Sequence, residues 1–392
     1  MTTLAPVDAA ASGPAPVPLS HRPDHRGSWI PTWGMVATRF MELRRRKGLM
    51  ITLLAVNIGL PVVFLTFRLI AHAVDPKSYG PAGGYSIFTT LVAGVLFIFG
   101  FIVAATVGCT AGSVDLTEGM FRHLVITGRS RLALYLARIP AGLAIVLPIV
   151  AVGFAIVCTV CILAAPTQLN YDGTKVPAGL SQPALDSWAT AHADEVICNF
   201  GLDIGPNSDL LQVVNSVNCG NGNGPGIKIG PGATTTAPVS HAQVEAAARQ
   251  IANLDYYDYH RNFLEPPTHL IIDSGLWVLL EATIGFVVGL GLASLMGQRT
   301  VPVILMIVLE VILTPVLSRT VIPHLINAQR GIVGLAMSHL EPAGLPSPFG
   351  GNGQSGQIML VPESRTVAVC VIVGWLVVWT ALGAWQMVTR DA

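Results

Sequence analysis

Two carboxylates in long apolar segments are the residues of this sequence with the clearest potential for chemistry. Glu281 falls near the middle of the apolar segment 270–296, and Glu310 falls near the middle of the segment 301–317. An unpaired charge at the centre of a bilayer costs at least about 2.5–3.5 kcal/mol on insertion scales, so such residues usually face a cavity or a partner, or stay protonated. The two glutamates therefore either line the path of a substrate, together with Asn57, or make structural hydrogen bonds to Asn57 or to a hydroxyl group on a neighbouring helix.

The cysteines support one prediction about redox chemistry. Cys198 and Cys219 are the two cysteines of the long polar stretch 166–269, and they would form a disulfide if that stretch lies on an oxidising side of a membrane. Cys158 and Cys161 have the C-x-x-C spacing, but they lie within an apolar segment. A redox-active pair needs a polar, accessible helix start, so we expect these two side chains to serve packing.

Motifs that would identify an enzyme are missing from the sequence. There is no H-E-x-x-H, no phosphate-binding Walker motif and no G-x-S-x-G. The glycine-rich run 219–226 is not preceded by a strand pattern or followed by Lys-Ser/Thr, which excludes the nucleotide-binding interpretation. The ten histidines are scattered along the chain. We therefore expect no enzymatic activity, no cofactor and no metal site in this chain.

The composition places the chain in the membrane. Of its 392 residues, 52% are hydrophobic and 11% are charged, whereas soluble domains carry roughly 25% charged residues. Because so few charges cannot cover a water-facing surface, we expect the lipid bilayer to be one of the partners of this protein. The formal net charge is zero, which gives no reason to expect a nucleic-acid partner.

Long apolar segments predict an all-α polytopic membrane protein with six transmembrane helices and a large outer insertion, residues 166–269, between helices three and four. A span needs about 20 apolar residues to cross the hydrocarbon. The predicted spans are 49–71, 85–108, 132–164, 270–296, 301–317 and 366–388. Within the insertion, helices are predicted at 185–200 and 241–264. Small residues at every fourth position from Gly285 to Gly297 permit close helix contact, either as ordinary packing or as a dimer face.

The segments outside the spans have distinct compositions. Residues 1–28 are rich in proline and alanine, and we expect a disordered cytoplasmic tail. Residues 29–165 would hold an amphipathic helix and the first three spans. Residues 270–392 would hold the last three spans, and segment 319–363, rich in proline and glycine, predicts a short re-entrant or interfacial helical pair on the outer side.

Basic residues near the ends of the spans predict the orientation. The positive-inside rule counts short loops and span flanks. The side with both termini carries Arg39, Arg44, Arg45, Arg46, Lys47, Arg122, Arg129, Arg131, Arg299 and Arg390. The opposite side has Lys77 in its short loop and four basic residues across the whole insertion. Both termini are therefore expected in the cytoplasm, and the alanine- and arginine-rich composition indicates a bacterial plasma membrane.

The segment 29–47 before the first span has apolar residues at helical spacing and a basic end. This pattern predicts an amphipathic helix that lies along the membrane surface, with Arg39, Glu42, Arg44 and Arg45 on its polar side. The alternative is a plain basic flank of the first span.

The segment 109–131 concentrates charge in a chain that has few charges. Asp115 or Thr117 could cap a short helix over 120–126, whose Met120, Phe121 and Leu124 would present an apolar face to a groove on a partner. The alternative is a surface loop that its arginines keep in the cytoplasm.

This segment resembles the region after the second span in permeases of the ABC type-2 exporter family, where an acidic, glycine-containing segment leads into a short coupling helix and a T-x-x-S-R turn. The matching residues are Asp115, Glu118, Gly119, Arg122, Leu124, Thr127, Arg129, Ser130 and Arg131. The six spans, the basic helix before the first span, the cytoplasmic termini and the re-entrant segment are also similar to that family. The resemblance covers the membrane portion, and the insertion 166–269 departs from the compact members.

The resemblance implies a permease subunit of an ABC exporter that forms a homodimer or heterodimer with another permease and binds a separate ATPase subunit, which holds the ATP. The substrate would be hydrophobic or amphipathic, such as a drug, an antibiotic or a lipid, and spans one, two and five would line its path. The implied ATPase contacts are Glu118, Phe121, Arg122, Leu124, Arg129 and Arg131, and the implied connecting helix carries Arg39, Glu42, Arg44 and Arg45. The alternatives are a non-transporting scaffold or sensor whose outer domain binds a partner, and an intramembrane enzyme, for which the sequence offers no nucleophile–base pair.

Overall fold

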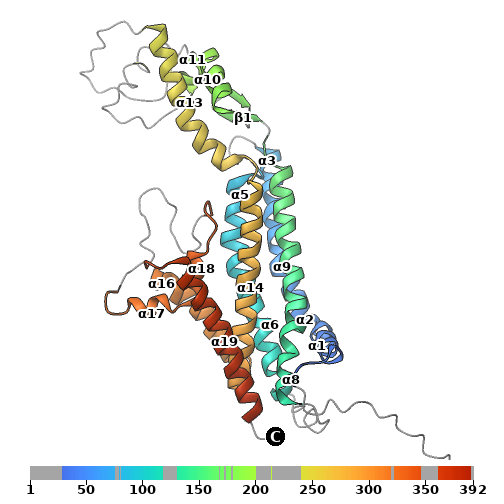
Figure 1. The fold of residues 1–392 in the computed structure, drawn as a ribbon. Coiled ribbons are helices and arrows are strands. Elements are labelled where there is room, and N and C mark those ends of the chain that lie inside the picture. The colour runs from blue at the N-terminus through green and yellow to red at the C-terminus, as the bar shows by residue number, and fades with distance from the viewer. Residues whose placement is uncertain are drawn as a thin grey trace, which may run out of the picture.

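The computed structural model of the chain describes residues 29–75, 79, 81–117, 130–166, 168–171, 174–177, 180–199, 213, 240–318, 322–345 and 361–389. These residues form a long helical bundle with a smaller helical unit at one end (Figure 1). Helix α1 and the C-terminal end of the last helix lie at the other end, which we call the α1 end.

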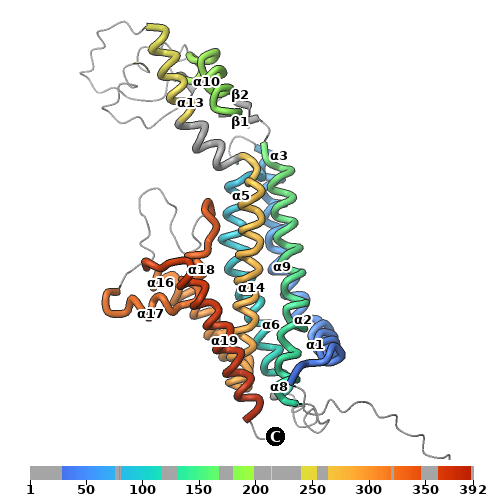
Figure 2. Tube along the Cα trace, viewed as in Figure 1, coloured from blue at the N-terminus to red at the C-terminus, as the bar shows by residue number. Residues whose placement is uncertain are grey.

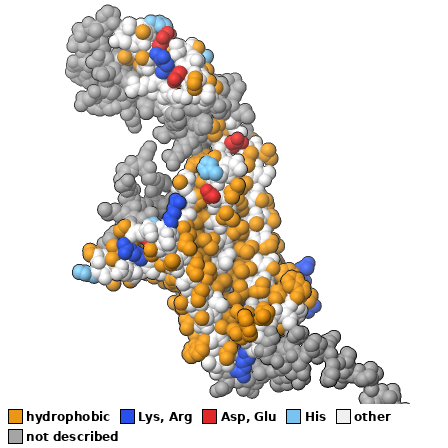
Figure 3. All heavy atoms as spheres, viewed as in Figure 1, with side chains coloured by type: hydrophobic (Ala, Val, Ile, Leu, Met, Phe, Trp, Pro, Cys, Tyr) orange, Lys and Arg blue, Asp and Glu red, His pale blue; other side chains and the backbone are white. Residues whose placement is uncertain are grey.

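Six helices in the described ranges are long and apolar enough to cross a membrane, as predicted. The first three spans comprise α2 (Lys47–Leu54), η1 (Ala55–Gly59) and α3 (Leu60–Val74); α5 (Tyr85–Thr89), η2 (Thr90–Phe97) and α6 (Ile98–Thr117); and α8 (Arg131–Leu136) and α9 (Arg138–Leu163). The last three comprise α14 (Thr268–Met296); α15 (Thr300–Ile307), η3 (Val308–Leu313) and α16 (Thr314–Ser318); and α19 (Arg365–Thr389). The three η segments are π-helical turns within longer helices. Hydrophobic side chains cover the visible face of the bundle (Figure 3).

Helix α14 lies at the centre of the bundle, where it packs against α6, α9 and α19 (Figure 2). Its contact with α6 is close because both helices carry glycine at the crossing. A Cβ atom on Gly108 would lie 2.1 Å from the carbonyl oxygen of Phe286, and one on Gly289 would lie 2.6 Å from that of Ala105. Within a membrane such small residues let van der Waals packing hold helices together. The small-residue stripe of α14 therefore serves internal packing.

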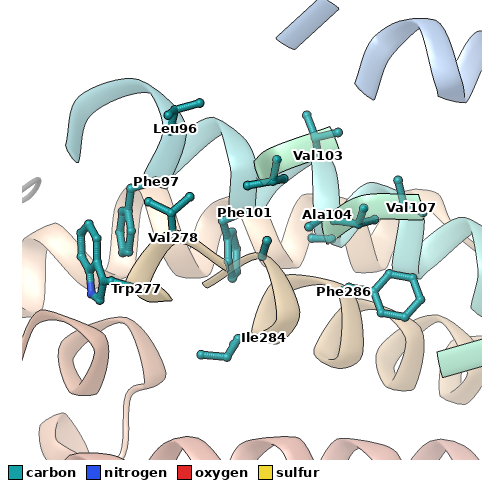
Figure 4. Close-up of a cluster of buried hydrophobic side chains, with 14 of the residues drawn as sticks. Leu96, Phe97, Phe101, Val103, Ala104, Val107, Trp277, Val278, Ile284 and Phe286 are labelled. Carbon is teal, nitrogen blue, oxygen red and sulfur yellow. The ribbon is translucent and has the colours of Figure 1, made fainter. Parts of the chain in front are cut away.

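Aromatic side chains fill the space beside this glycine contact (Figure 4). Phe97 stacks on Trp277 with the ring centroids 4.0 Å apart, and the planes are inclined by 9°. The indole nitrogen of Trp277 donates a 3.0 Å hydrogen bond to the carbonyl oxygen of Met337, so the buried ring has its polar group satisfied. This bond joins the central helix to α18 (Val333–His339), which follows α17 (Ile326–Arg330).

The α17–α18 segment is the helical pair predicted within 319–363, as far as that segment is described. It is tied to the bundle by Trp375 of α19, whose indole nitrogen donates a 2.8 Å hydrogen bond to the Gly331 carbonyl oxygen. Residues 319–321 and 346–360 lie outside the described residues.

The stretch 166–269 contains both strands of the described chain, β1 (Gln168–Tyr171) and β2 (Thr174–Pro177), which pair antiparallel. Apart from this hairpin, the described elements are helical, as predicted. Helix α13 (His241–Phe263) matches the prediction for 241–264, but the helix expected at 185–200 is divided at His192 into α10 (Gln182–Ala191) and α11 (Ala193–Asn199). These three helices enclose a hydrophobic core of their own, which includes Leu185, Ala189, Val196, Ile197, Ala248 and Ile251.

Candidate functional site

The α1 end of the bundle holds a buried cluster of charges. Helix α1 (Trp33–Arg45) is separated from α2 at Arg46, whose φ of −79° and ψ of 81° break the helix. This break lets α1 turn aside and pack against α9, with Arg39 directed at the end of α6. Trp33 and Met41 remain 82% and 51% exposed, which is the pattern of a helix that lies in a membrane interface.

Asp115 of α6 is the centre of this cluster. The Arg39 guanidinium donates two hydrogen bonds to its carboxylate, with Nη1–Oδ1 and Nη2–Oδ2 distances of 2.8 and 2.5 Å. Arg138, the first residue of α9, donates to Oδ2 of Asp115 and also to the Gly112 carbonyl oxygen at 3.1 Å. Bidentate arginine–carboxylate pairs fix orientation as well as adding energy. One carboxylate thus joins three helices, since its partners Arg39 and Arg138 lie 76 and 23 residues from Asp115 in sequence.

Charge balance explains how these groups tolerate burial. The side chains of Asp115 and Arg138 are 3% and 2% exposed, and that of Arg39 is 11% exposed. Glu42 supplies the second negative charge through a 2.7 Å ion pair with Arg39. Burial lowers the pKa of Arg39, but the carboxylates of Asp115 and Glu42 outweigh it and hold that pKa above its usual value. The cluster therefore contains two positive and two negative side chains.

The structure corrects the prediction made for Asp115. Helix α6 continues to Thr117, so Asp115 lies within the helix of the second span, where its carboxylate accepts hydrogen bonds from Arg39 and Arg138. The sequence pattern predicted correctly that Arg39 and Glu42 lie on an amphipathic helix, but it gave Arg138 no role. The available signal was a charged residue near the end of each of two apolar segments, which usually requires a partner.

The remaining predicted contact residues have mixed outcomes. Glu118, Phe121, Arg122, Leu124 and Arg129 lie outside the described residues. Arg131 begins α8 and donates a 3.1 Å hydrogen bond to the Val388 carbonyl oxygen of α19. Arg44 and Arg45 are exposed at the end of α1. The disulfide prediction also stays untested, because Cys219 and the side chain of Cys198 lie outside the described part of the structure.

Glu281 of α14 and Glu310 of η3 are neighbouring carboxyl groups within the bundle. They are 1% and 0% exposed. Within the described residues, Oε2 of Glu281 and both carboxylate oxygens of Glu310 have no hydrogen-bond partner. Helix α18 packs onto this pair at Gly334, where a Cβ atom would lie 3.0 Å from Oε2 of Glu310 and 2.6 Å from Oγ1 of Thr314.

Asn57 does not join the glutamate pair. It is buried in η1 of the first span, and its amide donates a 3.0 Å hydrogen bond to the Leu53 carbonyl oxygen of its own helix. The alternative in which the Asn57 amide donates a structural hydrogen bond to a glutamate is therefore wrong. Asn57 and Glu310 nevertheless share one property, since both lie in π-helical turns, which occur often at functional sites.

A cavity of about 680 Å³ lies between α2, α6 and α15. These helices belong to spans one, two and five. Arg46 and Arg299, each the residue before a span helix, stand at its rim. Four threonines from the three helices line its wall: Thr52, Thr106, Thr110 and Thr300.

Within the described residues, no group of three or more histidine, cysteine, aspartate or glutamate side chains could hold a metal ion. Comparison with known proteins gives no match to a family model, to a curated protein or to a solved structure.

Proposed function

We propose that this chain is the membrane-spanning permease subunit of an ABC exporter, which moves a hydrophobic or amphipathic substrate with ATP hydrolysed by a separate subunit. The observation that carries the proposal is the buried cluster of Arg39, Asp115 and Arg138. It fastens the amphipathic helix α1 to the ends of spans two and three, which are the two spans that segment 118–129 connects.

The cluster supports a coupling role through mechanical connection. A partner that binds segment 118–129 would move the end of α6 and the start of α8, the helix that leads into α9, because the segment connects α6 to α8. Because Asp115 holds Arg39 and Arg138 at once, α1 would move with both ends. Separating these groups would leave buried charges unpaired, which costs several kcal/mol. Motion at the segment would thus reach three helices together.

The cavity between spans one, two and five supports a substrate path. The resemblance to type-2 exporter permeases assigns the path to the same three spans, which is an argument by analogy. Val103, Thr106 and Thr110 of α6 line the cavity and Asp115 lies in the same helix, so movement of α6 would change the shape of the cavity. Glu281 and Glu310, deeper in the bundle, would lie on the continuation of this path.

Orientation follows from the basic residues at the α1 end, which we place on the cytoplasmic side of a bacterial plasma membrane. The proposed assembly pairs two permeases, as a homodimer or a heterodimer, with ATPase subunits bound to segment 118–129.

Co-purification tests the proposal. The chain is expressed with each candidate ABC ATPase subunit of its source organism, as wild type and as a Phe121→Ala/Leu124→Ala variant. We expect the wild type to retain the ATPase and the variant to lose it, because these side chains would fill the groove of the partner. Leu325→Ala, an exposed apolar residue (52%) near α17, is the matched control and should retain the ATPase. Equal retention by the wild type and the Phe121/Leu124 variant would contradict the docking role.

One observation favours the alternative function of a scaffold or sensor. The helices α10, α11 and α13 enclose their own hydrophobic core, as a separate binding domain would. Deletion of residues 168–263 discriminates the two functions, since a permease would keep its ATPase partner and a scaffold would lose its outer partner while binding no ATPase.

A further inference from the structure

The cavity at the α1 end has a polar rim and an apolar wall. We propose that it binds an anionic lipid whose headgroup carries hydroxyl groups, with the headgroup at Arg46 and Arg299 and an acyl chain along the wall. The claim that this lipid is the substrate of an exporter rests on the proposed function. The claim that the cavity binds the lipid does not.

The charge of the rim selects an anion. Arg46 and Arg299 immediately precede α2 and α15, so both stand where a span begins and where lipid headgroups would lie. A guanidinium presents donors in a planar fork that matches a phosphate group. The described residues that line the cavity include no acidic side chain.

The threonines of the wall select hydroxyl groups on that anion. Thr52, Thr106 and Thr110 each donate their hydroxyl hydrogen to a carbonyl oxygen one turn earlier in the same helix, at 2.8–3.0 Å. Their oxygens keep acceptor capacity but have no further hydrogen to give. A phosphate alone would find few donors among them, whereas the hydroxyl groups of a glycerol or sugar headgroup would find acceptors.

The apolar wall and the side opening suit an acyl chain. Leu49, Val103, Val303 and Ile304 line the cavity, and Ile304 is 54% exposed on the outer face of the bundle. Helices α2 and α15 both pack against α6, and the cavity lies in the space between α2 and α15. Gly48 also lines the cavity, and a Cβ atom there would meet nothing within 4 Å. The cavity can therefore be entered from the surrounding lipid.

A second copy of the chain is a poorer occupant for reasons of charge. Two-fold dimers bring the same surface of both subunits together. A dimer contact centred on this rim would bring Arg46 and Arg299 of each copy close to those of the other, and like charges that face each other oppose association.

Native mass spectrometry of the purified chain without any ATPase tests this binding. The probes are dioleoyl phosphatidylglycerol, the equally charged dioleoyl phosphatidylmethanol, which lacks the hydroxyl groups, and dioleoyl phosphatidylcholine. We expect affinity to fall in that order. The Arg46→Gln/Arg299→Gln variant should bind phosphatidylglycerol about twenty-fivefold more weakly, since each basic side chain near a membrane surface contributes about fivefold.

Arg44→Gln/Arg45→Gln is the matched control, because it removes the same charge from the neighbouring exposed turn of α1. It should keep the preference for phosphatidylglycerol. Gly48→Phe should also weaken lipid binding while it leaves every charge in place, and this variant decides the question if the arginine variant does not fold. Circular dichroism and gel filtration establish folding of each variant.

Three results would overturn the proposal. The first is an unchanged preference for phosphatidylglycerol in both cavity variants, and the second is displacement of the lipid by glycerol phosphate at a similar concentration. The third is cross-linking between copies through Thr52→Cys with no lipid bound, which would make the cavity a dimer contact. Loss of ATPase co-purification together with retained lipid binding would contradict only the permease function, so the two failures are distinguishable.

Discussion

Asp115 is the residue on which the charge balance at the α1 end depends. Asp115→Asn would leave the buried guanidinium groups of Arg39 and Arg138 without their shared carboxylate. Breaking a buried ion pair from one side costs about 3–5 kcal/mol, so we expect a clearly lower Tm of the detergent-purified protein. Glu42→Gln is the control, because its side chain is 31% exposed and exposed pairs contribute about 0–1 kcal/mol. Equal Tm values for both variants and the wild type would show that the cluster does not hold α1.

Glu281 and Glu310 give a prediction about export of the substrate. Oε2 of Glu281 and both carboxyl oxygens of Glu310 have no hydrogen-bond partner among the described residues, so a purely structural role would leave much of their polarity unused. We expect Glu281→Gln and Glu310→Gln to fold normally but to lose export of the substrate, measured as efflux from cells or vesicles. Full efflux by both folded variants would assign them to structure.

At the scale of elements, the contact between α6 and α14 depends on the absence of side chains. Gly108→Ala would place a Cβ atom 2.1 Å from the Phe286 carbonyl oxygen, so the helices must separate, and overpacking typically costs about 1–3 kcal/mol. Gly374→Ala in α19 is the control, because its Cβ atom would meet nothing within 4 Å. We expect thermal unfolding to show a lower Tm for the first variant and an equal or higher Tm for the second. An unchanged Tm for Gly108→Ala would show that this close contact does not hold the two helices together.

The segment after α18 gives a prediction of pH dependence. Burial raises the pKa of Glu341 to about 8, far above the value of 4.3 or so for an unfolded chain. The folded segment therefore binds the proton more tightly than the unfolded one, and its stability is highest at low pH and falls as pH rises from about 4.3 to about 8. Glu341→Gln should reduce this fall in Tm between pH 5 and pH 8. An identical pH profile for variant and wild type would contradict burial of this carboxyl group.

For the whole molecule, the sequence predicted what hydropathy and local periodicity control. The six spans, α1 and α13 follow from apolar runs and helical spacing, because a bilayer demands length and apolarity directly. The division at His192 and the strands β1 and β2 were missed, since short polar segments carry weak periodicity. The meeting of Arg39, Asp115 and Arg138 could not be predicted, because it depends on the way three separate helices pack. The placement of Arg46 and Arg299 at one cavity depends on packing for the same reason.

The permease function involves the whole molecule, because movement at the α1 end must reach the cavity and the pair Glu281 and Glu310. Its most direct test is the ATPase activity of the separate subunit in lipid nanodiscs, with and without this chain. We expect the wild-type chain to bind the ATPase and stimulate ATP hydrolysis, and Phe121→Ala/Leu124→Ala to abolish both effects. A wild-type chain that purifies alone and never changes the rate of ATP hydrolysis would contradict the permease function.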